Sequence, residues 1–313
     1  MPQDRHTVCI FAPALFVTVT IEKGDDDRDD IHIHPGGQGF WIARMVRHLG
    51  ESAVLCAPLG GETGRVAQAI MPDWGIDLAP IPIAGSSPAY VHDRRTGERH
   101  PVAERACPIL DRHELDDVYA SFLDHALAAD VCVITGRADK LFSAETYRRF
   151  GSDLAANGVR VVGDFHGAEL HAFLDGGPID VLKVSDEDLT QDGEIEHTDE
   201  DLAGAIARLR ARGVETVIVS RGARPAVARF DHVMITARPP ELKEVDHRGA
   251  GDSMTAALAV GLARGMLPEE MLRLACAAGA ANVARHGLGN ASVDLIAQLA
   301  DRVELIRVAE AVS

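Results

Sequence analysis

The chain has 313 residues, of which 46% are hydrophobic and 4% are aromatic, so it is long enough to bury a large core. Its formal net charge of −17 at pH 7 leaves no basic stripe for the phosphates of a nucleic acid, and we therefore exclude a nucleic-acid partner. No run reaches the ~18 apolar residues that a membrane helix needs, so we expect no membrane partner and interpret the acidity as that of a cytoplasmic protein.

The N-terminal region carries strand signals. Residues 8–21 are rich in apolar and β-branched side chains and no cleavage pattern follows them, so we interpret them as a first buried strand and not as a secretion signal. Apolar and polar residues alternate at 16–21 and again at 31–34, on either side of an acidic turn, which predicts a β-hairpin. We interpret His32 and His34 as exposed histidines of this hairpin, because no third metal ligand is evident.

Strand and helix signals then alternate along the chain. PGGQG at 35–39 opens a helix that ends at Gly50, and a second hairpin is predicted around the turn at 94–97. The remaining strands are predicted at 52–60, 76–83, 129–136, 159–165, 179–185 and 214–222. The remaining helices are predicted near 64–74, 111–128, 143–157, 199–212, 251–265, 268–286 and 293–310.

This alternation predicts an α/β fold with a mostly parallel sheet and helices on both faces. The two hairpins, at about 16–35 and 86–105, interrupt the rhythm. We expect them to form a small β-sheet lid over the carboxyl edge of the sheet, where open α/β sheets place their ligands. Residues 1–313 then form a single domain, with the lid hairpins inserted in the α/β core.

A glycine–aspartate turn precedes a long apolar helix in VDHRGAGDSMTAALAVGLARG, from Val245 to Gly265. The amides of Gly249, Ala250 and Gly251 lie where a helix starts, so they lack internal partners and can hold an anion such as a phosphoryl group. A carboxylate beside a bound phosphate is repulsive unless it has a chemical role. Asp252 is therefore a candidate base for a hydroxyl that attacks phosphorus, although an ordinary N-terminal helix aspartate is the simpler alternative.

The same string resembles the D-T-x-G-A-G-D signature of the ribokinase-like (PfkB) carbohydrate kinases. Its GAGDSM form is most similar to the branch of the 1-phosphofructokinases and tagatose-6-phosphate kinases. PGGQGFWIARMVRHLG is similar to the branch's first signature, P-G-G-K-G-x-N-x-A-x-x-L-x-x-L-G. LGGETG at 59–64 is similar to its L-G-G-x-x-G, and SRGARPA at 220–226 occupies the place of its S-x-G-x-x-G-A.

The resemblance implies a fold and a reaction. The fold is ribokinase-like, a Rossmann-like α/β domain whose β-sheet lid closes over the sugar and often pairs in a homodimer. The reaction transfers the γ-phosphoryl group of ATP to a hydroxyl of a sugar or phosphosugar, with Mg²⁺ required. Asp252 is then the general base, and the amides of Gly249, Ala250 and Gly251 are the anion hole of the transition state. Arg248, just before this hole, either adds positive charge there or faces solvent.

On the ATP side the resemblance implies roles for Ser220 and Gly222, with Asn282 on the helix behind the adenine. Pro225 departs from the pattern, because it replaces the second glycine of the nucleotide loop.

The K-P-N-x-x-E-L motif of the branch reads KVSDEDL here. Lys183 keeps the lysine, Ser185 replaces the asparagine and Asp188 replaces the glutamate. In the branch the last two residues order water around Mg²⁺. Asp188 keeps the charge on a shorter side chain, so we expect it to contact the metal indirectly, through water, and metal use to be weaker.

The acceptor side departs further. Phe16 stands where the branch has the aspartate that grips sugar hydroxyls, Gln38 replaces a lysine and Trp41 replaces an asparagine. Pro88 replaces an arginine of the T-R-x-N motif, and Arg137 replaces a small residue of S-G-S-L-P. The acceptor-binding positions implied by the resemblance are Phe16, Gly36, Gly37, Gln38, Trp41 and Arg137. The loss of the carboxylate and lysine contacts indicates an atypical pocket, and Arg137 partly restores a contact to phosphate.

Two functions follow. The first is an ATP-dependent kinase of a sugar, a phosphosugar or a nucleoside-like compound that stacks on Trp41 or Phe16. The second is a catalytically weak homologue that binds ATP or a metabolite as a sensor. Retention of GAGD favours the kinase, whereas the altered Ser185 and Asp188 favour the sensor.

Overall fold

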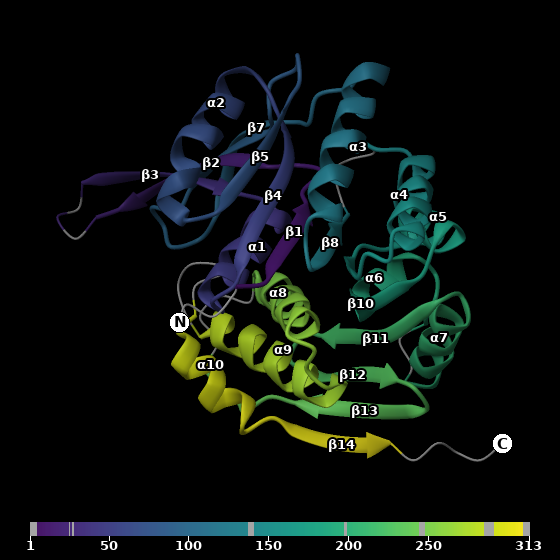
Figure 1. Cartoon of the computed structure of the whole chain (residues 1–313). Helices are drawn as coiled ribbons and strands as arrows, with labels where there is room; N and C mark the ends of the chain where they lie inside the picture. The colour runs from purple at the N-terminus through teal and green to yellow at the C-terminus, as the bar shows by residue number, and fades with distance from the viewer. Residues whose placement is uncertain are drawn as a thin grey trace.

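Two β-sheets organise the fold, as Figure 1 shows. This computed structural model describes residues 5–24, 26, 28–136, 141–196, 199–243, 248–284 and 291–308.

Within the described residues, the large sheet has ten strands. In spatial order they are β14 (Glu304–Val308), β13 (Val233–Arg238), β12 (Arg224–Phe230), β11 (Val214–Arg221), β10 (Ile179–Ser185), β9 (Val161–Asp164), β8 (Val131–Thr135), β1 (Thr7–Phe11), β4 (Ser52–Leu59) and β5 (Asp77–Pro82). The strands from β11 to β5 pair in parallel, and β12, β13 and β14 extend the sheet with antiparallel pairs. The predicted α/β fold with a mostly parallel sheet is confirmed.

Helices cover both faces of this sheet, because successive side chains of a strand point to opposite sides. In β1, Val8 and Ile10 join one buried cluster, and Cys9 and Phe11 join the other. The first cluster is covered by α1 (Gln38–His48), α8 (Ala250–Ala263), α9 (Pro268–Val283) and α10 (Val293–Ala300). The second is covered by α3 (Arg112–Leu127), α4 (Ala144–Ala156), α5 (Gly167–Gly176), α6 (Asp186–Gln191) and α7 (Asp199–Ala211).

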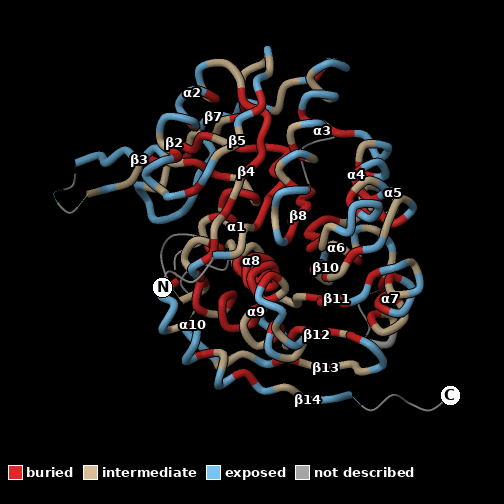
Figure 2. Tube along the Cα trace, viewed as in Figure 1, coloured by how far each residue is buried: buried red, intermediate tan, exposed pale blue. Residues whose placement is uncertain are grey.

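Helix α8 runs through the first cluster, and Figure 2 shows it buried along most of its length. A helix that is apolar on all sides must be enclosed by other elements. Gly261 permits the close approach of α9, because a Cβ there would lie 2.6 Å from Cγ of Met271. This packing fixes the first turn of α8 at the carboxyl edge of the sheet. None of the helices in the described part of the chain has the length and apolar content to cross a membrane.

The second sheet, called the lid sheet below, has four strands among the described residues. Their order is β3 (Asp29–Gly36), β2 (Phe16–Lys23), β6 (Ala89–Asp93) and β7 (His100–Arg105). Strands β2 and β3 form one hairpin, β6 and β7 form the other, and β2 pairs with β6 in parallel. Helix α2 (Gly61–Ile70), followed by a 3₁₀ turn, η1 (Met71–Trp74), packs against β2 and β3.

Two expectations about the elements are wrong. Residues 8–21 are not one strand, because the chain leaves the large sheet after Phe11 and enters the lid sheet at Phe16, with Pro13 in the break. Residues 293–310 are not one helix, because α10 ends at Ala300 and β14 then pairs with β13.

Candidate active site

A cavity of about 1050 Å³ lies between the lid sheet and the carboxyl edge of the large sheet. Its walls come from the lid sheet, the start of α1, the ends of β9 and β10, and the start of α8. The lining includes Asp252, Lys183 and Asp188 on the large-sheet side, and Phe16 and Trp41 on the other. The structure thus brings residues proposed for catalysis, nucleotide and acceptor into one cavity.

The start of α8 has the geometry expected for an anion site. Gly249 is the N-cap with a φ of 73°, in the left-handed region that favours glycine, and no described side chain caps this end. A Cβ on Gly251 would lie 2.7 Å from Nζ of Lys183. The first glycine therefore permits the turn, and the second permits the lysine to approach the amides of the first helical turn.

Asn282 supports this turn from α9. Its side-chain nitrogen donates a hydrogen bond of 2.7 Å to the carbonyl of Arg248, and its side chain is buried. Asn282 lies outside the cavity lining, whereas Arg248 belongs to it. Through this hydrogen bond, Asn282 therefore holds the residue that precedes the anion site. Asp246 and His247, also in the motif, lie outside the described residues.

Asp252 lines the cavity and keeps part of its surface open to it. Burial and, to a smaller extent, the charge of Asp164 raise the pKa of Asp252 to about 7, although Lys183 opposes this shift. A carboxyl group with this pKa is close to balance between its two protonation states at neutral pH, as an efficient general base requires.

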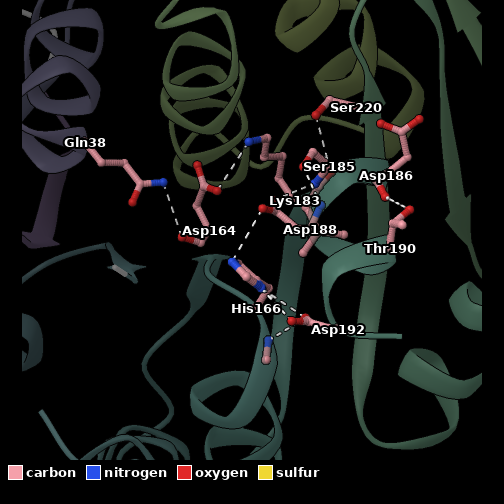
Figure 3. Close-up of polar contacts among 12 residues, drawn as sticks. Gln38, Asp164, His166, Lys183, Ser185, Asp186, Asp188, Thr190, Asp192 and Ser220 are labelled. Atoms are coloured by element: carbon pink, nitrogen blue, oxygen red, sulfur yellow. Dashed lines mark hydrogen bonds and ion pairs between the residues drawn. The ribbon is translucent and has the colours of Figure 1, made fainter. Parts of the chain in front are cut away.

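Lys183 and Asp164 form a buried ion pair, drawn in Figure 3, and the charges of both act on Asp252. Nζ of Lys183 lies 3.3 Å from Oδ1 of Asp164, and the hydroxyl of Thr255 donates to Oδ2 at 2.5 Å. Burial alone would lower the pKa of Lys183, but nearby carboxylates outweigh it and raise this pKa. These carboxylates belong to Asp164, Asp252 and Asp188.

Sequence reasoning missed Asp164. It ends the buried strand β9, and a carboxylate at the carboxyl end of a parallel strand is the signal that points to it. Thr255 was also missed, although it lies three residues after Asp252 and so shares a face of α8 with it.

Asp188, in the first turn of α6, is held by Ser185 and by His166, which precedes α5. Its Oδ2 accepts a hydrogen bond of 3.0 Å from the amide of Ser185, and its Oδ1 lies 3.5 Å from Nε2 of His166. Nδ1 of His166 in turn lies 2.9 Å from Asp192 (Figure 3). Burial raises the pKa of Asp188, but these contacts outweigh burial. The pKa is therefore lowered, and the carboxyl group stays ionised.

This donor set fits a magnesium ion only indirectly. No three metal-binding side chains converge anywhere in the described part of the chain, and both oxygens of Asp188 already have protein partners. Mg²⁺ commonly keeps several waters and uses one or two carboxylates together with nucleotide phosphates. Asp188, which lines the cavity, fits contact to such a hydrated ion through water.

The remaining ATP-side candidates lie at the ends of β10 and β11. Ser185 and Ser220 are register partners, and the hydroxyl of Ser220 donates to the carbonyl of Val184 at 3.4 Å. Gly222 has a φ of 58° in the turn after β11. Ser185, Ser220 and Gly222 are not part of the described cavity lining. They lie at the ends of β10 and β11, however, next to the part of β10 from which Lys183 lines the cavity.

The acceptor-side candidates converge at the start of α1. The side-chain amide of Gln38 donates to the carbonyl of Asp164 at 3.3 Å and so ties α1 to β9. A Cβ on Gly37 would lie 2.7 Å from the carbonyl of Ala14, and its φ is 108°. Gly36 packs against Thr18 of the lid sheet, since a Cβ there would lie 3.0 Å from the hydroxyl.

Both aromatic replacements line the cavity. Phe16 packs edge-on against Tyr90, with ring centroids 5.0 Å apart, and Trp41 packs against the fully buried Phe40 at 4.7 Å. Arg137, the other acceptor candidate, lies outside the described residues.

Three further arginines of the cavity lining were missed, namely Arg44, Arg94 and Arg99. Arg44 follows Trp41 by three residues on α1, so helical spacing places both on one face. The other two lie between the strands of the second hairpin, where sequence alone does not tell which side chains turn inward.

Comparison with known proteins agrees with this geometry. A model described as "pfkB family carbohydrate kinase" matches residues 15–295. The ATP-dependent 6-phosphofructokinase isozyme 2 of Escherichia coli is 28% identical over 257 residues, 81% of this chain and 82% of that protein. The tagatose-6-phosphate kinase of Staphylococcus epidermidis is 24% identical over 276 residues, 87% of this chain and 89% of that protein.

Among solved structures, phosphofructokinase-2 from Escherichia coli in complex with fructose-6-phosphate has a TM-score of 0.79 at 25% identity. The match covers 95% of this chain and 98% of that one. The family model spans well over half of the sequence, and the predicted kinship is confirmed. The chain belongs to the pfkB family of carbohydrate kinases.

Proposed function

We propose that this chain, acting as one domain with the lid sheet over its site, phosphorylates a hydroxyl of a sugar or phosphosugar with ATP as the donor. The observation that carries the proposal is the start of α8. There Asp252, with a pKa of about 7, lies beside uncapped helical amides in a cavity that also meets the lid sheet. A protein that only senses a ligand does not need a base with this pKa, so the same observation favours the kinase over a sensor.

The proposed step is a direct transfer. Asp252 accepts the proton of the acceptor hydroxyl as the oxygen forms a bond to the γ-phosphorus. The bond from that phosphorus to the bridging oxygen breaks, and the electron pair leaves with ADP. The amides of Gly249, Ala250 and Gly251 stabilise the charge on the transferring group, and Lys183 adds a positive charge beside them.

We assign the nucleotide to the edge formed by Lys183, Ser185 and Ser220, with Gly222 in the following turn and Asn282 supporting the anion site. A bound Mg²⁺ would neutralise phosphate charge, with Asp188 holding its water shell. The acceptor lies on Phe16, Gly36, Gly37, Gln38 and Trp41. The amide of Gln38 already donates to the protein, and Trp41 packs against Phe40, which supports an acceptor pocket different from that of the branch.

The direct test is ADP release with Mg-ATP against matched panels of free sugars, phosphosugars and nucleosides. Turnover with a sugar or a phosphosugar is expected. Turnover with nucleosides only would favour the alternative acceptor, a nucleoside-like compound that stacks on Trp41 or Phe16. ATP binding with no turnover on any hydroxyl compound would favour the sensor.

The pH profile gives a second check. Asp252 must be ionised to accept a proton, and its pKa is raised to about 7. We expect kcat/KM to be low at pH 5.5, to rise through about pH 7 and to level off above it, since this ratio reports the free enzyme. The measurement is initial rates from pH 5.5 to 9 at saturating Mg²⁺. A profile that is flat down to pH 5.5 would contradict the assignment of the base.

We also propose that the lid sheet pairs two copies of the chain. Its edge strands carry Ile31, Ile33 and Val102, each more than half exposed, and exposed apolar edge strands favour pairing with another chain. Sedimentation should give a dimer in the wild type and a monomer in Ile31→Lys/Ile33→Lys. A wild-type monomer at micromolar concentration would contradict this proposal.

A further inference from the structure

Two carboxylates lie one helical turn apart on α6. Asp188 is in the first turn of this helix, and Asp192 is its C-cap, whose amide donates a hydrogen bond of 3.0 Å to the carbonyl of Asp188. Residues four apart share one face of a helix, and like charges at this spacing repel each other. The two side chains are only 23% and 15% exposed, so water screens this repulsion incompletely. The pair therefore needs a group that compensates for the repulsion.

The imidazole of His166 lies between these two carboxylates, as Figure 3 shows. Its Nδ1 lies 2.9 Å from Oδ1 of Asp192, and its Nε2 lies 3.5 Å from Oδ1 of Asp188. A carboxylate oxygen can only accept a hydrogen bond, so Nδ1 is the donor to Asp192. The contact through Nδ1 thus orients the ring, and Nε2 is the atom that faces Asp188.

The segment between β9 and α5 holds the ring in this place. His166 is the N-cap of α5, and Gly167 follows it with a φ of 68°. The amide of Gly167 donates to Oδ2 of Asp192 at 2.7 Å, and a Cβ on Gly167 would lie 3.3 Å from Oδ1 of the same carboxylate. The positive φ and this close approach both favour glycine. The start of α5 therefore binds both oxygens of Asp192.

These contacts act on the cavity through Asp188. His166 and Asp188 belong to the described cavity lining, whereas Asp192 lies outside it. The amide of Ser185 holds Oδ2 of Asp188 at 3.0 Å, and His166 faces its Oδ1, so each oxygen has a protein partner. Neither His166 nor Asp192 lies in KVSDEDL or in another string that resembles a family signature. The motif comparison thus describes Asp188 without the pair that holds it.

We propose that His166, oriented by Asp192, is a positioning residue that holds the carboxylate of Asp188 where it contacts the water shell of the nucleotide's magnesium ion. The inference rests on the proposed kinase function, in which Asp188 holds that shell. Partners that orient a metal-binding group commonly contribute 10- to 100-fold, roughly, to metal affinity. A fixed orientation then offsets the reach that Asp188 lacks as the shorter side chain.

Two substitutions divide the contacts of the ring. His166→Asn keeps an amide nitrogen near the place of Nδ1, so it can still donate to Asp192, but it has no atom at the place of Nε2. His166→Gln places its amide nitrogen near Nε2 and loses the donor at Nδ1. Asp188→Asn removes the charge of the carboxylate itself. His171→Asn is the matched control, because His171 lies on α5, pairs with Glu194 at 3.6 Å and lies outside the described cavity lining.

The metal dependence of nucleotide binding can be measured without turnover. Calorimetric titration gives the dissociation constant of adenylyl imidodiphosphate, an ATP analogue that resists hydrolysis, in EDTA and again at saturating Mg²⁺. The first constant divided by the second is the metal contribution to binding. General damage to the nucleotide site raises both constants together, whereas a positioning role changes their ratio. A melting temperature for each variant reports its fold.

We expect the ratio to fall about tenfold in Asp188→Asn and in His166→Asn. His166→Gln should keep most of it, and His171→Asn should equal the wild type. An unchanged ratio in His166→Asn beside a lowered ratio in Asp188→Asn would overturn the inference and leave the proposed function intact. Equal falls in the two His166 variants, or a comparable fall in His171→Asn, would also overturn it, because the effect would not then pass through Nε2. No binding of the analogue, equal constants in the wild type, or an unchanged ratio in Asp188→Asn would contradict the proposed function, and the inference with it.

Discussion

Replacement of Asp252 by asparagine should lower kcat by about 10²–10⁴-fold, the range that a positioned general base contributes. The asparagine keeps the size of the side chain and loses only its ability to accept the proton. ATP affinity should change little, because the amides at the start of α8 remain. Initial rates of ADP release and a separate measurement of ATP binding test both statements. The matched control is Asp294→Asn, which changes a first-turn aspartate of α10 outside the cavity lining.

The same substitution should not weaken the fold at pH 8. The pKa of Asp252 is raised in the folded chain, to about 7, from about 3.9 for an unfolded aspartate. The folded state therefore holds the proton more tightly, and stability falls as pH rises from about 4 to 7. Above pH 7 the wild type carries the full cost of this ionised group, and the asparagine variant does not. Thermal unfolding should therefore favour the variant more at pH 8 than at pH 5. A kcat above about a tenth of wild type, or a variant less stable at pH 8, would contradict this account.

Short strings predicted the start of α8 because the physical constraint there is local. Gly249 adopts a positive φ, Gly251 makes room for a side chain, and an apolar run follows at once. Such constraints appear in sequence as residue types at fixed spacing. The alternation of strands and helices similarly predicted the mostly parallel sheet, because the spacing of apolar residues that marks a strand or a helix can be recognised within each segment.

Contacts between distant segments could not be predicted in this way. Asp164 meets Lys183 and Thr255 because β9, β10 and α8 come together at one edge of the sheet. His166 reaches Asp188 only because α5 and α6 start side by side. For β14, the five residues ELIRV are too few to distinguish a strand from the continuation of a helix, and its partner strand ends 66 positions earlier, at Arg238.

The acceptor pocket shows the same limit in a single side chain. The sequence left Trp41 equally open to ligand contact or to packing. The structure gives it both a place in the cavity lining and contacts with Phe40 and Arg44. The sequence also indicated a pocket that had lost cations, whereas two arginines line it at positions that the motifs do not specify: Arg44, on α1 with Gln38, and Arg99, between β6 and β7. A motif comparison records the cations lost at signature positions and misses those gained elsewhere.

Replacement of Lys183 by methionine should destabilise the protein by about 3–5 kcal/mol, the usual cost of removing one partner from a buried ion pair. Lys183 and Asp164 are 7% and 6% exposed, and Nζ lies 3.3 Å from the carboxylate. The substitution leaves Asp164 and Asp252 as two carboxylates in one buried site. Urea unfolding at pH 8 measures the loss. The double variant Lys183→Met/Asp164→Asn should recover much of it, because the uncompensated charge is then removed while the amide can still contact Thr255.

The pH profile links this pair to catalysis. Lys183 holds the pKa of Asp252 down and Asp164 pushes it up. In Lys183→Met the rise of kcat/KM should therefore shift to a pH clearly above 7, and in the double variant it should return toward the wild-type position. A purely structural lysine would change stability without moving the profile. An unshifted profile in the single variant would show that Lys183 does not act on the base, and a double variant less stable than the single one would show that the ion pair is not the source of the cost.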